Sequence, residues 1–161
     1  MIYADNAATT RMNEAALEAL TDCVRNDYGN PSSLYAFGQT AEEKLESARA
    51  EIAGIIGAAS PREILFTSGG SEADNQALIS AAAIGRRKGK MHIVSTAFEH
   101  HAVLHTLQKL KNEGFRVTLL DVHENGIVLP EEVEAAIQED TCLVSVMYAN
   151  NEIGTVQPIA E

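Results

Sequence analysis

The sequence has 161 residues, of which 45% are hydrophobic and 22% charged, and its 12 Lys and Arg against 23 Asp and Glu give a formal net charge of −11. This composition is typical of a folded globular protein and excludes a disordered or fibrous one, while the length suggests a single domain. A surface this acidic repels phosphates over most of its extent, which argues against nucleic acid or an anionic membrane as a partner.

The first third of the sequence predicts two helices. Apolar residues recur at helical spacing over residues 13–28, behind Asn13, which is a good N-cap residue. A Pro- and Gly-containing loop at residues 29–33 interrupts the pattern, and a longer helix resumes near Gln39. Its apolar stripe runs to Ile55, and Gly57 stands where a C-terminal cap is expected. Each helix is expected to bury one face.

The rest of the sequence alternates between short apolar strands and helices. Strands are predicted at residues 64–67, 92–95, 117–120 and 142–147, and helices at residues 72–87, at 102–113 and after Pro130. This order predicts an α/β fold, a mainly parallel sheet flanked by helices, with ligands bound beyond the carboxyl ends of the strands. The last residues, from Gln157, resemble the start of a further helix.

Membrane and disulfide signals are weak throughout. No apolar run approaches the ~20 residues that a membrane-spanning helix needs, and the first residues lack the regions of a signal peptide. We therefore expect a cytoplasmic protein. Cys23 and Cys142 are far apart and in no paired spacing, so neither a disulfide nor a metal site is expected, and both are predicted to be structural.

The first strand-to-helix turn combines Gly69, Gly70 and Ser71. Such a turn presents free backbone N–H groups and the positive end of a helix dipole, so it suits a phosphate. Ser71 can donate its hydroxyl to that phosphate or simply cap the helix, and the local sequence favours the capping role. The turn matches neither a Walker loop nor a dinucleotide fingerprint.

The second turn contains His100, which could stack on a flat cofactor and move protons near neutral pH. The alternative is a surface or capping histidine. His101 and His105 could share a helix face and bind a metal, but no third ligand is indicated.

The third turn, residues 148–154, contains Asn150 and Asn151. Their amides can bind a ligand oxygen, although Asn is also an ordinary turn residue. If the strand ends converge, a phosphate cradle, a flat ring and a polar amide together indicate a phosphorylated aromatic cofactor.

Five motifs then occur in order: residues 5–10 (DNAATT), 29–33 (GNPSS), 67–75 (TSGGSEADN), 99–100 (EH) and 150–154 (NNEIG). In order and spacing they resemble the NifS/IscS-type cysteine desulfurases of the class V aminotransferase group, which are fold-type-I enzymes dependent on pyridoxal 5'-phosphate (PLP). In that family a lysine holds PLP as a Schiff base, L-cysteine replaces the lysine, and an enzyme cysteine takes the sulfur as a persulfide, leaving L-alanine.

The resemblance implies a role for each matching residue. Gly70 and Ser71 would bind the cofactor phosphate, His100 would stack on the pyridine ring and assist proton transfer, and Asn151 would bind the ring oxygen or the substrate carboxylate. The family's lysine, its persulfide cysteine and its remaining cofactor contacts lie beyond the position of Glu161. Residues 1–161 are therefore expected to be part of the large PLP-binding domain with an N-terminal helical segment, and to be inactive alone.

The resemblance also implies partners. These are L-cysteine as substrate, a sulfur-acceptor or scaffold protein for iron–sulfur cluster or thiocofactor assembly, and a second copy, as a homodimer or higher association, which an exposed sheet edge would favour. Two alternatives are another class V enzyme (selenocysteine lyase, kynureninase or transaminase), which the NNEIG turn disfavours, and a non-catalytic binding domain.

Overall fold

A computed structural model describes residues 2–161 of the chain. The chain divides into two compact units, an N-terminal unit (Met1–Phe66) and a C-terminal unit (Thr67–Glu161), where the length alone suggested one domain. Each unit is described by itself.

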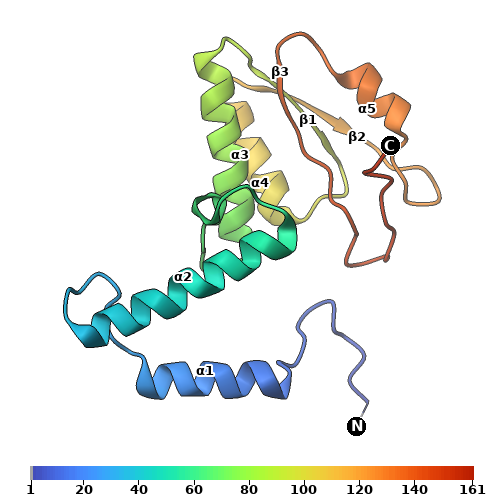
Figure 1. The fold of residues 1–161 in the computed structure, drawn as a ribbon. Helices are drawn as coiled ribbons and strands as arrows, with labels where there is room; N and C mark the ends of the chain where they lie inside the picture. Colours follow the sequence, from blue (N-terminus) through green and yellow to red (C-terminus); the bar gives the residue numbers. More distant parts are fainter. Residues whose placement is uncertain (1) are drawn as a thin grey trace. The chain divides into compact units, whose positions relative to one another are not determined.

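The N-terminal unit is helical, as predicted (Figure 1). Helix α1 (Glu14–Asn26) is capped by Asn13, whose Oδ1 accepts a hydrogen bond of 2.8 Å from the Ala16 N–H. Helix α2 (Ala36–Ile56) ends at Gly57, which adopts the left-handed conformation with φ 72° that glycine accepts without strain. The predicted apolar stripes are not buried: Leu17, Leu20 and Val24 of α1 are 43%, 48% and 67% exposed. In α2 the buried residues are Gly38 and Ala53.

The strand predicted at residues 64–67 is wrong. A single 3₁₀ turn (η1, Pro61–Glu63) precedes it, the Ile64 N–H bonds back to Pro61 O at 3.1 Å, and the segment pairs with no strand among the described residues. The Ile64 carbonyl instead accepts a hydrogen bond from Arg49. Because a strand exists only where a neighbour completes its hydrogen-bond ladder, apolar sequence alone does not create one.

The C-terminal unit contains the predicted parallel sheet. Strands β1 (His92–Thr96), β2 (Arg116–Leu120) and β3 (Thr141–Val144) form a three-stranded sheet in the order β2-β1-β3, with both pairings parallel. Helices α3 (Gly70–Arg87) and α4 (His101–Asn112) cover one face, and α5 (Pro130–Ala136) lies on the other (Figure 1). Strand β3 ends earlier than predicted, and the expected final helix is wrong, since residues 157–161 contain only a turn at residues 159–160.

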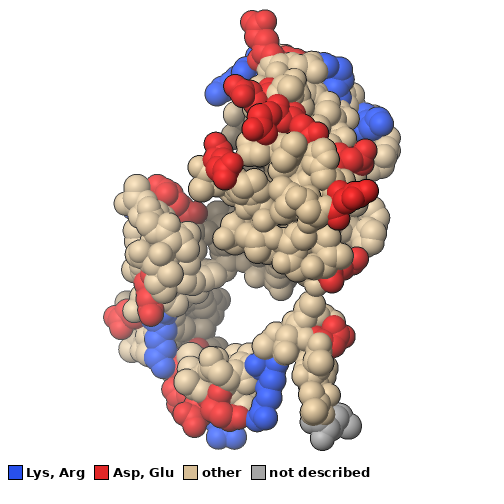
Figure 2. Space-filling model, turned by 90° about the vertical axis from the view of Figure 1, so that its right-hand side faces the viewer, with Lys and Arg blue, Asp and Glu red and all other residues tan. Residues whose placement is uncertain are grey.

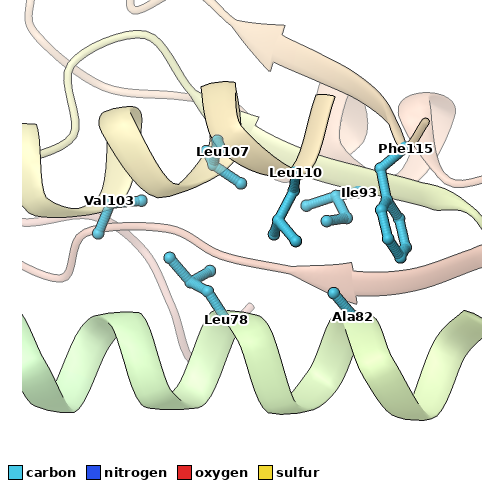
Figure 3. Packing of buried hydrophobic residues seen from close by; sticks show 7 residues of the cluster. All are labelled: Leu78, Ala82, Ile93, Val103, Leu107, Leu110 and Phe115. Atoms are coloured by element: carbon cyan, nitrogen blue, oxygen red, sulfur yellow. The ribbon is translucent and has the colours of Figure 1, made fainter. Parts of the chain in front are cut away.

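One hydrophobic cluster forms between the sheet and the helices α3 and α4 (Figure 3). Every residue in it is at most 7% exposed, and each belongs to α3, α4, β1 or the turn before β2. Its members are Leu78, Ala82, Ile93, Val103, Leu107, Leu110 and Phe115. Burying one such large side chain stabilises a fold by about 1.5–3 kcal/mol, so this cluster holds the C-terminal unit together.

The two cysteines differ in their surroundings. Cys142 lies in β3, where its Sγ donates to His92 O at 3.3 Å and burial raises the pKa of its thiol, as expected of a structural cysteine. Cys23 is exposed on α1, so for it the structural assignment is wrong.

Acidic side chains outnumber basic ones on the visible face (Figure 2). Among residues 2–161, none of the helices combines the length and the apolar character needed to cross a membrane.

Candidate functional site

The chain leaves the carboxyl ends of β1 and β3 side by side. The Ser145 N–H donates to Val94 O at 3.0 Å, which extends the pairing of these strands past Val144, while the Ala97 N–H donates to Leu120 O at 2.8 Å on the other side. The histidine turn (residues 97–101) follows β1, and the asparagine turn (residues 148–154) follows the extension of β3. Parallel strands thus deliver both turns to one edge of the sheet, where ligands bind in folds of this type.

The glycine turn (residues 67–71) leads into α3. Helix α3 has Gly69 as its N-cap, without any side-chain capping bond, so the favoured interpretation of Ser71 as the cap is wrong. Within residues 2–161 neither the Ser71 hydroxyl nor the N–H groups of Gly70, Ser71 and Glu72 have a hydrogen-bond acceptor. A Cβ placed on Gly69 or on Gly70 would also meet nothing within 4 Å outside its own turn. Free donors at the start of an 18-residue helix form a site for an anion.

A second contact orders Ser68 within this turn. The Glu72 carboxylate accepts hydrogen bonds of 2.6 Å from both the N–H and the hydroxyl of Ser68, and these bonds lower its pKa. The carboxylate is thereby directed at Ser68, which precedes the free donors of Gly70 and Ser71. The sequence offered a partial signal for it, a serine followed one turn later by a glutamate, similar to a capping box.

His100 is exposed and begins helix α4 as its N-cap residue. Its Nδ1 accepts a hydrogen bond of 3.1 Å from the Ala102 N–H, so in the neutral ring the proton sits on Nε2. The capping alternative is therefore correct, but it occupies one ring nitrogen only and leaves Nε2 and the ring faces available to a ligand. His101 stacks on His105 with 5.5 Å between ring centroids, and the described residues contain no group of three candidate metal ligands.

The two asparagines of the asparagine turn have different roles. Asn150 is half-buried, donates from Nδ2 to Phe98 O at 3.2 Å and accepts at Oδ1 from the Glu152 and Ile153 N–H groups at 2.8 and 3.0 Å. Asn151 is exposed, and its side chain makes no hydrogen bond with any residue that the structure describes. Asn150 thus shapes the turn, and Asn151 remains available to a ligand.

Sequence reasoning assigned no role to Glu99, which is 7% exposed. Its Oε1 accepts hydrogen bonds from the Met147 N–H at 2.6 Å and from the Thr96 hydroxyl at 3.1 Å, and burial raises its pKa. Asp74, in the second turn of α3, adds to this rise as a neighbouring negative charge. Glu99 therefore links the strand ends.

The start of α3 is also tied to α4. The Thr106 hydroxyl contacts Asn75 Oδ1. Through Asn75 the second turn of α3 contacts α4, the helix that begins at the histidine turn. An apolar groove of about 440 Å³ lies between α5 and β3. It is lined by Val133, Ile137 and Val144 among others and shares no residue with the three turns.

The free groups at this edge fit a phosphorylated aromatic cofactor. Unpaired N–H groups and a hydroxyl suit a phosphate, an exposed imidazole face suits a flat ring, and a free amide suits a ring oxygen or a carboxylate. The fit rests on free polar atoms of Ser71, His100 and Asn151. If these atoms had a structural role, each would have a hydrogen-bond partner, and none has one among the described residues. We find no comparable set of free donors around the apolar groove among the described residues.

The sequence profile described as aminotransferase class-V matches residues 2–161. The chain is 51% identical over 160 residues to a putative cysteine desulfurase IscS 1 of Bacillus subtilis, covering 99% of this chain and 42% of the relative. It is 48% identical over 160 residues to a cysteine desulfurase IscS of Methanosarcina thermophila, covering 99% and 39%. The chain thus spans about two fifths of the length of these curated relatives.

Solved structures agree with these similarities. A NifS-like protein matches 96% of this chain and 42% of its own with a TM-score of 0.90 and 42% identity. A structure titled SspA in complex with cysteine matches 98% of this chain and 45% of its own with a TM-score of 0.88 and 37% identity.

Proposed function

Because the chain belongs to the aminotransferase class-V family, we propose that it forms the cofactor-holding part of a PLP-dependent cysteine desulfurase. Such an enzyme converts L-cysteine to L-alanine and transfers the sulfur to one of its own cysteines. The observation that carries the proposal is the set of three free groups, on Ser71, His100 and Asn151, at one edge of the parallel sheet. The high identity to relatives named as desulfurases supports it.

Each residue has a distinct role in this proposal. The N–H groups of Gly70 and Ser71 and the Ser71 hydroxyl hold the phosphate, where the dipole of α3 favours negative charge. His100 packs its ring against the flat cofactor and holds a proton at Nε2, because Nδ1 is engaged by the Ala102 N–H. Asn151 donates to a cofactor or substrate oxygen. PLP, when bound, draws electrons from the substrate carbon that bears the amino group.

The partners are proposed with the activity. L-cysteine is the proposed substrate, and the sulfur passes to an acceptor or scaffold protein in the cytoplasm. We also propose self-association, as a homodimer or higher assembly, because apolar side chains such as Leu34, Ile55 and Tyr148 are at least 65% exposed. Light scattering at micromolar concentration tests this point, and a monodisperse monomer would contradict it.

A chimera tests the activity. Residues 1–161 replace the matching part of the Bacillus relative, whose remaining length supplies the rest of the enzyme. The chimera is expected to bind PLP and to release alanine and, with a thiol reductant, sulfide from L-cysteine. The chain alone is expected to release neither, and alanine release by it would contradict the assignment of the reacting groups to the rest of the relatives' length.

Single substitutions in the chimera test the roles. His100→Ala is expected to lower kcat about 10²–10⁴-fold, the usual contribution of a general acid or base. Ser71→Ala is expected to weaken PLP affinity about tenfold, the loss of one hydrogen bond to a charged group. Matched controls are His105→Ala, an exposed histidine on the same helix, and Ser80→Ala, on the same helix as Ser71; both are expected to leave activity unchanged.

The outcomes separate the alternatives. A folded chimera that binds PLP and processes selenocysteine or a keto acid but releases no sulfide from L-cysteine would assign the chain to another class V activity. A folded chimera without PLP affinity would reject the cofactor-holding role and favour a non-catalytic domain.

A further inference from the structure

Glu99 is a buried carboxylate without a cationic partner. Its side chain forms no salt bridge within residues 2–161, and Asp74, also an acid, acts on it as a neighbouring negative charge. Burying a charge without a counterion costs free energy, which an apolar side chain at the same place would not. The hydrogen bonds that Glu99 accepts offset part of this cost.

Those hydrogen bonds join two distant parts of the chain. One oxygen, Oε1, accepts from Thr96 at the end of β1 and from the Met147 N–H, which is 48 residues further along the chain. Asn150 makes a parallel link to the Phe98 carbonyl at 3.2 Å. Residues 98 and 99 are thus fixed to residues 147 and 150 by two hydrogen bonds.

These two links flank the free groups of the proposed site. Glu99 immediately precedes His100, and Asn150 immediately precedes Asn151. The His100 ring and the Asn151 amide have no bonds of their own to each other, so their separation is set by the residues before them. A buried crosslink of this kind preorganises a site at little cost to ligand-binding entropy.

We propose that Glu99 is a positioning residue, whose carboxylate bridges the Thr96 hydroxyl and the Met147 N–H and thereby holds His100 and Asn151 at the spacing that the cofactor ring requires. The inference rests on the proposed function and deepens it. It distinguishes the ring contacts, which depend on Glu99, from the phosphate contacts at Gly70 and Ser71, which lie on another element and do not.

The test measures equilibrium binding of PLP, pyridoxal and inorganic phosphate to the chimera with the Bacillus relative, in which residues 1–161 carry the substitutions. Glu99→Ala is expected to weaken PLP and pyridoxal roughly tenfold, while phosphate affinity stays within about twofold of the unsubstituted chain. Glu99→Gln keeps the accepting oxygen and is expected to recover most of the PLP affinity. Glu132→Ala is the matched control, since Glu132 also accepts a backbone N–H, that of Leu129, but in helix α5.

A double-mutant cycle separates positioning from general stability. In a His100→Ala background, Glu99→Ala is expected to cost less PLP affinity than in the unsubstituted chain, because part of its effect acts through His100. Fully additive effects, or equal losses for PLP and inorganic phosphate, would overturn the role. If Glu99→Ala does not fold, Asn150→Ala cuts the parallel link and must reproduce the selective loss, and its failure to do so overturns the role as well.

The two proposals fail in different ways. A folded chimera that binds neither PLP nor pyridoxal rejects the proposed function and the role of Glu99 with it. A chimera that binds PLP, with unchanged affinity in the folded Glu99→Ala variant, rejects only the role of Glu99.

Discussion

Both units contain amphipathic helices, yet only the C-terminal unit packs the apolar faces of its helices into a hydrophobic cluster. In the C-terminal unit α3 and α4 pack against the sheet and form the hydrophobic cluster (Figure 3). In the N-terminal unit the apolar stripe of α1 is exposed, and the helix has no buried residue. An amphipathic pattern therefore identifies which face a helix can bury, but not that a partner for that face exists within the same unit.

The hydrophobic cluster and the proposed site lie in the same unit. The free groups of the proposed site lie on elements anchored by the hydrophobic cluster, in the C-terminal unit. A rigid scaffold beneath loops that carry binding groups is the usual arrangement, because loops alone cannot hold a fixed spacing. We therefore expect substitutions in the two units to have unequal effects.

The largest expected difference concerns buried leucines. Leu107→Ala in α4, where the side chain is 2% exposed, is expected to lower the free energy of unfolding by about 2–5 kcal/mol, through lost burial and a cavity. Leu20→Ala in α1, at 48% exposure, is expected to change it by less than about 0.5 kcal/mol. Urea denaturation of both variants measures the difference. Equal losses would mean that α1 packs its apolar stripe in solution, against another copy or another part of the chain.

Two glycine-to-alanine substitutions provide a second contrast, because they are expected to change the free energy of unfolding in opposite directions. A Cβ on Gly85 of α3 would lie 2.5 Å from Cys142 Cβ and 2.6 Å from its Sγ, so Gly85→Ala is expected to cost about 1–3 kcal/mol through overpacking. A Cβ on Gly54 of α2 meets nothing within 4 Å, so Gly54→Ala is expected to stabilise its helix by about 0.5–1 kcal/mol.

The measurement is again chemical denaturation, with far-UV circular dichroism to follow the helices. Destabilisation by Gly54→Ala would place another part of the molecule against that face of α2. A neutral Gly85→Ala would mean that β3 can move away from α3.

Local signals in the sequence were enough to predict most of the fold. Asn13, Gly57 and Pro130 act within one turn of their own positions, and the helices begin or end where these residues predicted. The prediction of a strand at residues 64–67 was wrong because strand formation depends on a distant partner. The same limit applies to β3, whose pairing with β1 ends as a regular strand at Val144 although the apolar sequence continues.

The candidate site was predicted only where its chemistry resides in single residues. Gly70, Ser71, His100 and Asn151 were identified from turn composition and from family resemblance, and their roles remain proposals. Glu99 was assigned no role, and Asn150 was considered only as a ligand-binding amide or an ordinary turn residue. The hydrogen bonds that define their positions reach 48 and 52 residues along the chain, and a sequence pattern does not display such contacts. The division of labour between Asn150 and Asn151 likewise depends on the folded turn.

A smaller effect is expected from the cap of α1. Asn13→Ala removes the side-chain oxygen that accepts from the Ala16 N–H and is expected to cost about 0.5–2 kcal/mol of helix stability. Because α1 has 13 residues and no buried face, its helicity depends on such local contacts. Asn13→Ser, which keeps an accepting side-chain oxygen at the N-cap, is the control and should leave the helical circular dichroism signal unchanged. Equal, negligible effects of both would indicate that tertiary contacts hold α1.

The smallest expected effect is a pH dependence carried by one buried side chain, His92 of β1. Its ring nitrogens bond the hydroxyls of Thr141 at 2.7 Å and Thr118 at 2.9 Å. Burial, with help from Arg116 and against the opposing charge of Asp140, lowers the pKa of His92. The folded state therefore prefers the neutral ring. The stabilising contribution is present above the unfolded pKa of about 6.5 and is lost as the pH falls through the lower folded value.

Comparison with His92→Gln isolates this contribution, because Glu99 acts in the opposite direction. Burial raises the pKa of Glu99, so its contribution is present at low pH and is lost as the pH rises through the folded value. Both forms of the protein keep Glu99, and its effect cancels in their difference. The stability advantage of the unsubstituted chain over His92→Gln is expected to shrink between about pH 7.5 and about pH 5.5 in urea denaturation. An advantage that stays constant or grows on acidification would mean that the two threonine hydroxyls stabilise the charged ring as well as the neutral one.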